Sequence, residues 1–494
     1  MATDLPDRTT ARRRADHTGS EEPLIPAEPP GPVAPGDPVS RRAVVAGSVA
    51  LGVSVVLAST TGDFGVLVAL LVAGAFGVIA IATGFRRFVH FFVAACLLRP
   101  LVDLTAGPRG QGVSVTEIFG IAVLAVMLLW LFTQRRLLVE RVVAPLPLAL
   151  LAIIAIFTLS TLGSPDLGEG LGSTLRMTAG IAVFFVVDLL LVTRRLSLRD
   201  VVQLVLAVAA IPLLYPFLGV LGVQVTHQKD GFTALKSVFY LSNNFAHFLV
   251  PLLVIGAAYV LRSQGRDRVL ALAFCALVGA ELILSQTRGA WLGALVGVLV
   301  VCVLLNRKLL LVGLAGVVLA GLFVPQVNTR LADLEPDSDQ PYAENSLTWR
   351  LDQWARLWPA ADDSPVLGSG PGTAVLLTGK EAHNDYMKML VDTGVLGLAA
   401  YLVFVIGAIV VAWRALRRVR RLARSDPDAA AAHPWVEALF AGIFAYALAA
   451  AAAAAGENLI DNVTFLWTAL PLFAAAGWAL RAEPEQLTLA RPTT

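Results

Sequence analysis

Residues 288–324 read RGAWLGALVGVLVVCVLLNRKLLLVGLAGVVLAGLFV, which is two apolar runs separated by Asn306-Arg307-Lys308. Each run has roughly the ~20-residue length that a bilayer requires, and neither has a polar face that would suit contact with water. The segment therefore predicts a tightly joined pair of transmembrane helices. Similar apolar runs recur along the rest of the chain.

The composition of the whole chain supports the same interpretation. Of 494 residues, 57% are hydrophobic and only 15% are charged, whereas soluble domains carry about 25% charged residues. A soluble enzyme of this size is therefore excluded. The net charge of +2 and the lack of a basic domain argue against nucleic-acid binding, and three cysteines exclude a disulfide scaffold.

The sequence predicts an all-α fold, a polytopic transmembrane helical bundle of about 12–14 spans. The expected spans are 43–60, 64–83, 87–102, 115–133, 142–162, 171–193, 200–222, 240–261, 268–286, 288–305, 308–324, 388–413, 435–455 and 463–481. The expected domains are a disordered cytoplasmic tail at 1–40, a membrane domain at 41–484 and a second cytoplasmic tail at 485–494.

Basic residues between the expected spans predict the orientation. With the N-terminus in the cytosol, every basic cluster falls on the cytoplasmic side, as the positive-inside rule requires. These clusters are Arg86/Arg87, Arg135/Arg136/Arg141, Arg194/Arg195/Arg199, Arg262/Arg266/Arg268, Arg307/Lys308 and Arg414 through Arg424. Both termini are then cytoplasmic. The longest outer segment, 325–387, is expected to form a small helical extracytoplasmic cap with a helix near Ser346–Trp358.

Two arginines on the expected outer side are candidate anion ligands. Arg288 lies at the turn between two spans, where a guanidinium near the membrane needs an anionic partner. Arg350 lies four residues before Trp354 on the expected cap helix, so both share one face. Because guanidinium groups bind phosphate in a bidentate manner, one hypothesis is a phosphate clamp. The alternatives are a snorkelling anchor for Arg288 and an ordinary ion pair for Arg350.

His383 begins the motif His383-Asn384-Asp385-Tyr386 at the entry to a span. An imidazole at a membrane–water boundary takes up or releases a proton near neutral pH, which suits a general base. Asn384 or Asp385 equally suits a helix N-cap, and the two roles are compatible. Arg176, near the outer start of another span, is a further candidate phosphate ligand.

Other polar groups on the same side carry weaker signals. Asn243, Asn244 and His247 share one side of a span, where they line a cavity or bond across helices. The loop Gly368–Gly372 exposes backbone N–H groups, but it lacks the ending of a P-loop, so a plain turn is favoured.

Metal binding has little support in the sequence. Asp337-Ser338-Asp339 matches the DxD pattern of metal-dependent glycosyltransferases, but a solvated turn is favoured there. No Cys/His set has zinc spacing, so no metal site is expected.

Taken in chain order, these motifs resemble the O-antigen ligase and O-antigen polymerase family of bacterial envelope glycosyltransferases. The shared order, over about residues 240–405, is Asn244, Ser285-Gln286-Thr287-Arg288-Gly289, Arg350 with Trp354, Gly368–Gly372, His383-Asn384-Asp385-Tyr386 and Asp392-Thr393-Gly394-Val395-Leu396-Gly397. The most specific part is the His-Asn motif followed by the acidic-x-Gly-x-x-Gly turn. The family often has Glu where Asp392 stands and Ser where Thr287 stands, which removes no charged group.

The resemblance implies a multi-pass enzyme of the bacterial plasma membrane that needs neither cofactor nor metal. Its donor is a glycan linked to a polyprenyl diphosphate, and its acceptor is a hydroxyl of a glycan, a lipid or the cell wall. The transfer inverts the anomeric carbon at the outer face. Arg288 and Arg350 match the diphosphate-binding arginines, Arg176 is a looser match, and His383 matches the catalytic histidine. The expected supporting residues are Asn244, Trp354, Asn384, Asp385 and Tyr386.

Two other functions remain open at this point. A polymerase that joins lipid-linked repeat units needs the same donor site as a ligase. A transporter or flippase for lipid-linked or anionic solutes predicts charges near mid-membrane and broken helices. Only Asp188 and Glu281 fit that description, and the sequence shows no evident partner for either. A purely structural scaffold leaves the outer arginines and His383 unexplained.

Overall fold

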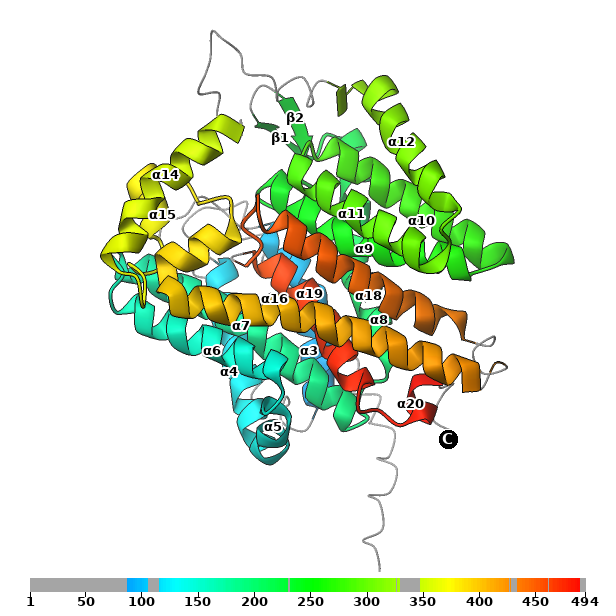
Figure 1. Cartoon of the computed structure of the whole chain (residues 1–494), viewed down its shortest axis with the longest axis horizontal. Coiled ribbons are helices and arrows are strands. Elements are labelled where there is room, and N and C mark those ends of the chain that lie inside the picture. The colour runs from blue at the N-terminus through cyan, green and yellow to red at the C-terminus, as the bar shows by residue number, and fades with distance from the viewer. Residues whose placement is uncertain are drawn as a thin grey trace, which may run out of the picture. The chain divides into compact units, whose positions relative to one another are not determined.

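The computed structural model describes residues 87–104, 115–229, 232–325, 327–328, 347–425, 427, 433–460 and 462–488 (Figure 1). These residues belong to one compact unit, Val44–Thr494. The expected tail at 1–40, the expected spans at 43–60 and 64–83, and most of the expected tail at 485–494 lie outside the described residues.

Helices dominate the described part of the chain, with one antiparallel hairpin between them. The elements are α3 (Phe88–Asp103), α4 (Val115–Thr133), α5 (Arg135–Val142), α6 (Pro145–Thr161), α7 (Leu167–Val192), α8 (Leu198–Leu214), η1 (Tyr215–Leu221), β1 (Thr226–Lys229), β2 (Phe232–Leu235), α9 (Ser242–Arg262), α10 (Gly265–Leu284), α11 (Arg288–Leu305), α12 (Leu309–Phe323), α14 (Leu347–Asp363), α15 (Thr373–Thr378), α16 (Asp385–Ser425), α18 (Pro434–Ala453), α19 (Val463–Ala479) and α20 (Pro484–Thr488).

The helices confirm the predicted all-α polytopic bundle. Every expected span from residue 87 onward coincides with a helix, and α8 is continued by η1. Among the described residues, 7 helices are long and apolar enough to cross a membrane, or up to 8 if the α5–α6 pair, bent by 106°, is one span. The remaining apolar helices α3, α12 and α19 are shorter, and α10 carries more charge.

Two groups of helices are joined through α16. In one group α18 packs against α9 and α11, and α10 packs against α9; in the other α7 packs against α19 and α6. Helix α16 lies against α6, α18 and α19, and runs beside α18 in Figure 1. All residues from Ala179 to Leu191 of α7 are buried, so α7 is an interior helix.

The two acidic residues expected near mid-membrane, Asp188 and Glu281, differ in whether they have a hydrogen-bond partner. Asp188 on α7 accepts two hydrogen bonds from the Arg141 guanidinium, at 2.8 and 2.6 Å. The sequence-based view that Asp188 lacks a partner is therefore wrong, because the partner lies 47 residues away on α5. Both carboxylate oxygens of Glu281 are buried without a hydrogen-bond partner among the described residues. Neither position supports the charged pathway that a transporter requires.

A break at Gly394 separates the first three turns of α16 from its long remainder. Gly394 has φ 65° and ψ −167°, and a Cβ there would meet the Val366 carbonyl oxygen at 2.3 Å. Only glycine fits such a position. In the segment before this break, the buried Lys388 ammonium lies 2.7 Å from Asp392 and 3.3 Å from Glu381. The family's acidic-x-Gly-x-x-Gly turn therefore shapes the entry into α16.

The predicted cap helix exists and is longer than expected. It is α14, and together with α15 it covers the first turns of α16 (Figure 1). A small apolar cluster of Leu357, Ala361, Ala374, Ala382 and Val391 joins these elements. Burial of such side chains contributes about 25 cal/mol per Å² of apolar surface, which fixes the cap onto the segment that carries His383.

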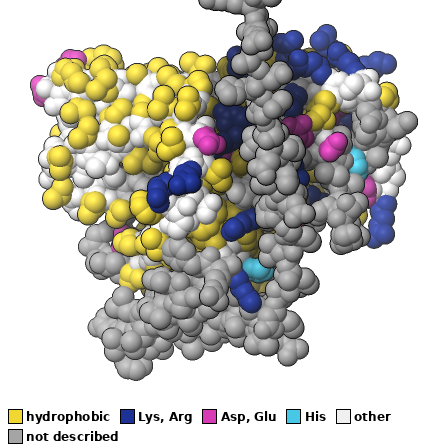
Figure 2. All heavy atoms as spheres, turned by 90° about the horizontal axis from the view of Figure 1, so that it is seen from below, with side chains coloured by type: hydrophobic (Ala, Val, Ile, Leu, Met, Phe, Trp, Pro, Cys, Tyr) yellow, Lys and Arg dark blue, Asp and Glu magenta, His cyan; other side chains and the backbone are white. Residues whose placement is uncertain are grey.

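Charge is unevenly distributed over the molecule. Arg414, Arg417, Arg418 and Arg421 line a hollow at the C-terminal end of α16, which we call the arginine-rich end. In Figure 2, Lys and Arg side chains gather toward the upper right of the face shown, while much of the described surface on the left is hydrophobic. The bundle thus has a basic end, and α16 starts at the other end.

Candidate active site

The loop between α18 and α19, residues 454–462, is held onto the start of α16. The Asp385 N–H donates to the Ala454 carbonyl oxygen at 2.8 Å, and the Ile460 N–H donates to both oxygens of the Asp385 carboxylate at 3.2 Å. The Asn384 N–H donates to Asn458 Oδ1 at 3.2 Å. These bonds bring the α18–α19 loop against the segment that precedes α16.

Glu457 of this loop lies at the centre of a ring of polar side chains. Its Oε1 is 3.5 Å from Arg350 Nη2, and its Oε2 is 3.8 Å from His247 Nε2 and 3.9 Å from His383 Nδ1. Asn243 Nδ2 donates to Oε2 at 3.5 Å. The Glu457 side chain is only 5% exposed. Residues of α9, α14 and the segment before α16 thus converge on one buried carboxylate.

The surroundings of Glu457 keep it ionised. Burial alone would raise the pKa of its carboxyl. The neighbouring imidazoles of His247 and His383 and the Arg350 guanidinium outweigh that effect and hold the pKa well below its ordinary value. The site therefore contains a fixed negative charge with cationic or titratable groups around it.

His383 is presented by a backbone that few non-glycine residues adopt, with φ 48°. Its ring meets Trp349 edge to face at a centroid distance of 5.9 Å, and Trp354 Nε1 donates to the carbonyl oxygen of Ala382 at 2.8 Å. Because Nδ1 faces Glu457, Nε2 lies on the other side of the ring. The side chain is 21% exposed, so the imidazole is not fully enclosed.

Arg350 is attached to the α18–α19 loop by two contacts. Its Nη1 donates to the Gly456 carbonyl oxygen at 2.8 Å, while Nη2 faces Glu457. Its side chain is 21% exposed, and its Nε has no hydrogen-bond partner among the described residues. Arg350 is therefore paired with a carboxylate, as the ion-pair alternative for this residue expected, and the carboxylate is that of Glu457.

Arg288 is the first residue of α11 and lies next to this ring. A Cβ on the following residue, Gly289, would sit 2.6 Å from Glu457 Oε1, so only glycine allows this approach. Thr287 donates to Asn243 Oδ1 at 3.1 Å, which fixes the start of α11 against α9. The half-buried Arg288 therefore starts from a backbone that touches Glu457.

Arg176 is engaged elsewhere. Its Nη2 donates to Glu169 Oε1 and to Ser173 Oγ, both at 2.7 Å and both on α7. Within the residues that the structure describes, no hydrogen bond or ion pair links Arg176 to Glu457, Arg350 or His383. Its proposed role as a phosphate ligand stays a prediction.

The expected supporting residues mainly fix the backbone. Asn384 caps α16, because its Oδ1 accepts from the Met387 N–H at 3.1 Å. Asp385 is fully buried and accepts from Tyr401 at 2.8 Å. Tyr386 donates to the Ala451 carbonyl oxygen at 2.9 Å, and Asn244 accepts from the Asn462 amide at 3.3 Å.

The loop Gly368–Gly372 has a structural role in the described chain. The N–H groups of Ser369 and Gly370 donate to the carbonyl oxygens of Val391 and Asp392, at 2.8 and 3.1 Å. These N–H groups are therefore used internally, which agrees with the favoured interpretation as a turn. The Asp337-Ser338-Asp339 triplet lies outside the described residues. Within the described residues, no group of three His, Cys, Asp or Glu side chains could hold a metal ion.

Sequence reasoning missed Glu457, the residue at the centre of the ring. The only signal is an acidic residue in Gly456-Glu457-Asn458, a short outer connection between two apolar helices. By the same rule that drew attention to Arg288, a charge at the membrane boundary indicates a functional or paired group. Its partners lie at least 74 positions away in sequence, so local spacing does not reveal them.

The fold defines a multi-pass helical membrane protein whose polar ring lies at the end opposite to the arginine-rich end. The family model described as O-antigen ligase matches residues 271–402, a segment that contains Arg288, Arg350 and His383. The resemblance of that segment to the O-antigen ligase family is therefore confirmed, and the family implies enzymatic glycan transfer. No curated protein matches the chain.

Proposed function

We propose that the protein is an integral-membrane glycosyltransferase of the O-antigen ligase type. It moves a glycan from a polyprenyl diphosphate carrier to an acceptor hydroxyl at the outer face of a bacterial plasma membrane, with inversion and without a metal ion. The observation that carries this proposal is the convergence of His383 and Arg350 on Glu457, next to the start of α11 at Arg288.

The arginines account for the donor. When the glycan leaves, the bond between the anomeric carbon and the diphosphate oxygen breaks, and negative charge grows on the diphosphate. Fixed guanidinium groups stabilise this charge most effectively where water is sparse. Arg350 lies at the ring, and Arg288 begins α11 beside Gly289, whose backbone lies against Glu457. A guanidinium is the group best suited to bind phosphate in a bidentate manner.

His383 accounts for the acceptor. The attacking hydroxyl must lose its proton as its oxygen bonds to the anomeric carbon, and a neutral imidazole within hydrogen-bond distance accepts that proton. With Nδ1 toward Glu457, the available base is Nε2. The carboxylate then stabilises the imidazolium that forms and holds the ring in place, as carboxylates do beside other catalytic imidazoles.

The orientation of the bundle supports the side on which this happens. The positive-inside rule assigns the arginine-rich end of α16 to the cytoplasm. The ring around Glu457 then faces outward, where a flipped lipid-linked glycan presents its diphosphate. On this assignment both termini are cytoplasmic.

The test uses the full chain reconstituted in nanodiscs with a polyprenyl-diphosphate-linked glycan and candidate acceptors. We expect release of polyprenyl diphosphate together with a new glycosidic bond. Full-length lipid-linked polymer should accumulate in a strain that lacks the protein. Accumulation of single repeat units would instead identify a polymerase, and movement of the carrier across the bilayer without a new bond would identify a flippase.

A further inference from the structure

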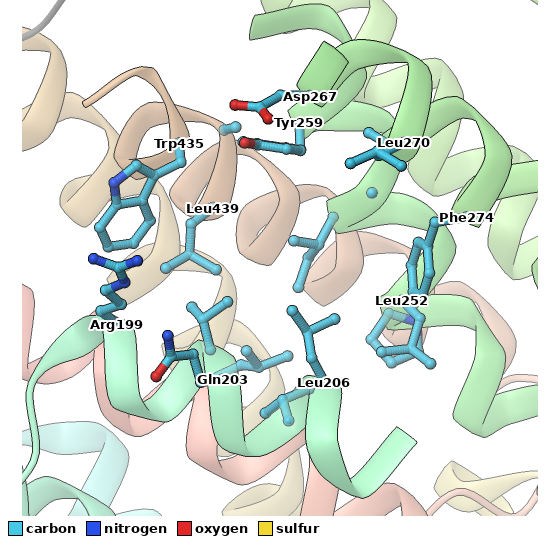
Figure 3. Close-up of a pocket in the computed structure, with 18 of the residues that line it drawn as sticks. Arg199, Gln203, Leu206, Leu252, Tyr259, Asp267, Leu270, Phe274, Trp435 and Leu439 are labelled. Atoms are coloured by element: carbon cyan, nitrogen blue, oxygen red, sulfur yellow. The ribbon is translucent and has the colours of Figure 1, made fainter. Parts of the chain in front are cut away.

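A cavity that shares no lining residue with the Glu457 ring lies between α8 and the group formed by α9, α10 and α18 (Figure 3). Its volume is about 590 Å³, within the range of pockets that hold small molecules. The inner walls are apolar, with Leu206, Leu252, Phe274 and Leu439 turned toward the space. We call it the α8–α10 groove.

Four residues at the rim of the groove come from helix ends on one side of the bundle, whereas Thr468 lines it from α19. Arg199 is near the start of α8, Tyr259 near the end of α9, Asp267 near the start of α10 and Trp435 near the start of α18. The α9–α10 and α16–α18 connections both lie at the arginine-rich end. The groove therefore has a polar rim at the membrane boundary and an apolar interior at membrane depth.

An empty groove and a water-filled groove are both energetically unfavourable. An apolar cavity gives water no hydrogen-bond partners, and an empty one forfeits the dispersion contacts of its walls. Trp and Tyr at the rim are the side chains that favour the headgroup region of a bilayer. An acyl chain in the interior with its headgroup at the rim satisfies both parts of the groove.

The charges at the rim indicate which headgroup fits. Arg199 and Asp267 lie at different edges of the opening in Figure 3, and both are exposed. Across the described residues, no ion pair or hydrogen bond engages either side chain. A guanidinium binds a phosphate and a carboxylate binds an ammonium group, so the rim complements a headgroup that carries both. The other polar residues at the rim are Gln203 and His433. Neither conflicts with a phosphate at Arg199 or an ammonium group at Asp267.

We propose that the α8–α10 groove binds one phosphatidylethanolamine-type phospholipid from the leaflet at the arginine-rich end. One acyl chain lies between Leu206, Leu252 and Phe274, the phosphate contacts Arg199, and the ammonium group contacts Asp267. This site is separate from the glycan-transfer site and does not depend on that activity.

The experiment uses the full chain in nanodiscs that contain phosphatidylethanolamine and phosphatidylglycerol. Photoreactive analogues of the two lipids with identical diazirine-bearing acyl chains are added in turn, and labelled peptides are identified by mass spectrometry. We expect labelling of α8, α10 and α18, with the phosphatidylethanolamine probe favoured about tenfold, the value of roughly one charge-assisted hydrogen bond.

Variants locate the site. Arg199→Gln and Asp267→Asn should each reduce this labelling several-fold, whereas Arg266→Gln, the neighbour outside the lining, should leave it unchanged. Ala271→Trp and Leu206→Trp fill the groove from different walls, and a monodisperse variant of either kind should lose the label. Equal labelling by both lipids, no labelling of these helices, or labelling that survives Arg199→Gln and Asp267→Asn would overturn the proposal.

Discussion

Helix α18 has a paired carboxylate at each end, and the two differ in their surroundings. At the arginine-rich end, Glu437 Oε1 accepts from Arg262 at 3.0 Å and from Arg420 at 2.8 Å. Just beyond the other end, Glu457 is ringed at 3.5 to 3.9 Å by Arg350, His247 and His383. Glu437 is tightly bonded to two arginines, whereas Glu457 is more loosely surrounded by one arginine and two imidazoles.

This difference separates structural from chemical use of charge. The hydrogen bonds from Arg262 and Arg420 to Glu437 connect α9, α16 and α18. Glu437 therefore has a structural role. The looser ring includes two imidazoles, the side-chain type that most often acts as a general base. A charged residue at a membrane boundary is therefore not enough to identify a functional site. The side chains that surround the charge distinguish a functional site from a structural ion pair.

The largest effect is expected from removal of the base. His383→Ala should reduce glycan transfer by about 10²–10⁴-fold, the usual contribution of a positioned general base, while membrane insertion stays intact. The measurement is the single-turnover rate with lipid-linked donor. His90→Ala, an exposed histidine of α3, is the control. A His383→Ala rate equal to wild type would show that another group takes the proton.

Removal of the charge on Glu457 should be the next largest effect. Glu457→Gln should slow transfer about 10–100-fold, the range found when an orienting partner of a functional imidazole is lost. Glu437→Gln is the matched control at the other end of α18 and should leave the transfer rate close to that of wild type. Equal rates for the two variants would contradict the role of Glu457.

Arg350→Lys tests the donor contact. Lysine keeps the charge but cannot contact Gly456 and a phosphate with one planar fork, so KM for the donor should rise about tenfold. Arg356→Lys on the same helix, where Arg356 is exposed and paired with Asp352, should leave KM unchanged. An unchanged KM for Arg350→Lys would remove Arg350 from the donor site.

The lowered pKa of Glu457 predicts a modest pH dependence of stability. A carboxyl with a depressed folded-state pKa stabilises the fold above its unfolded pKa, about 4.3, and that contribution is lost as pH falls through the folded value. The Tm difference between wild type and Glu457→Gln in detergent should therefore be constant from pH 7 to about pH 5 and shrink below that. A difference that grows toward acid pH would contradict the assignment of an ionised Glu457.

The smallest effect is expected from chelation. EDTA should leave transfer unchanged, because the proposed mechanism assigns stabilisation of the leaving diphosphate to arginines and not to a divalent cation. Strong loss of activity, restored by Mg²⁺ or Mn²⁺, would revive the Asp337 and Asp339 hypothesis.

The sequence alone predicts the bundle well because hydropathy is a local signal. Every expected span in the described residues is a helix, and the cap helix lies where it was expected, near Ser346–Trp358. Partners across the fold are not local, so Arg141 for Asp188 and Glu457 for Arg350 were missed. The family resemblance placed Arg288, Arg350 and His383 in one motif order, but only the structure shows what lies between them.

The most direct measurement is a structure of the full chain with a non-transferable polyprenyl-diphosphate glycan analogue in nanodiscs. The account predicts phosphate oxygens within hydrogen-bond distance of Arg288 and Arg350, with His383 Nε2 facing the anomeric carbon. A diphosphate bound at the arginine-rich end of α16, or one out of reach of His383, would contradict it.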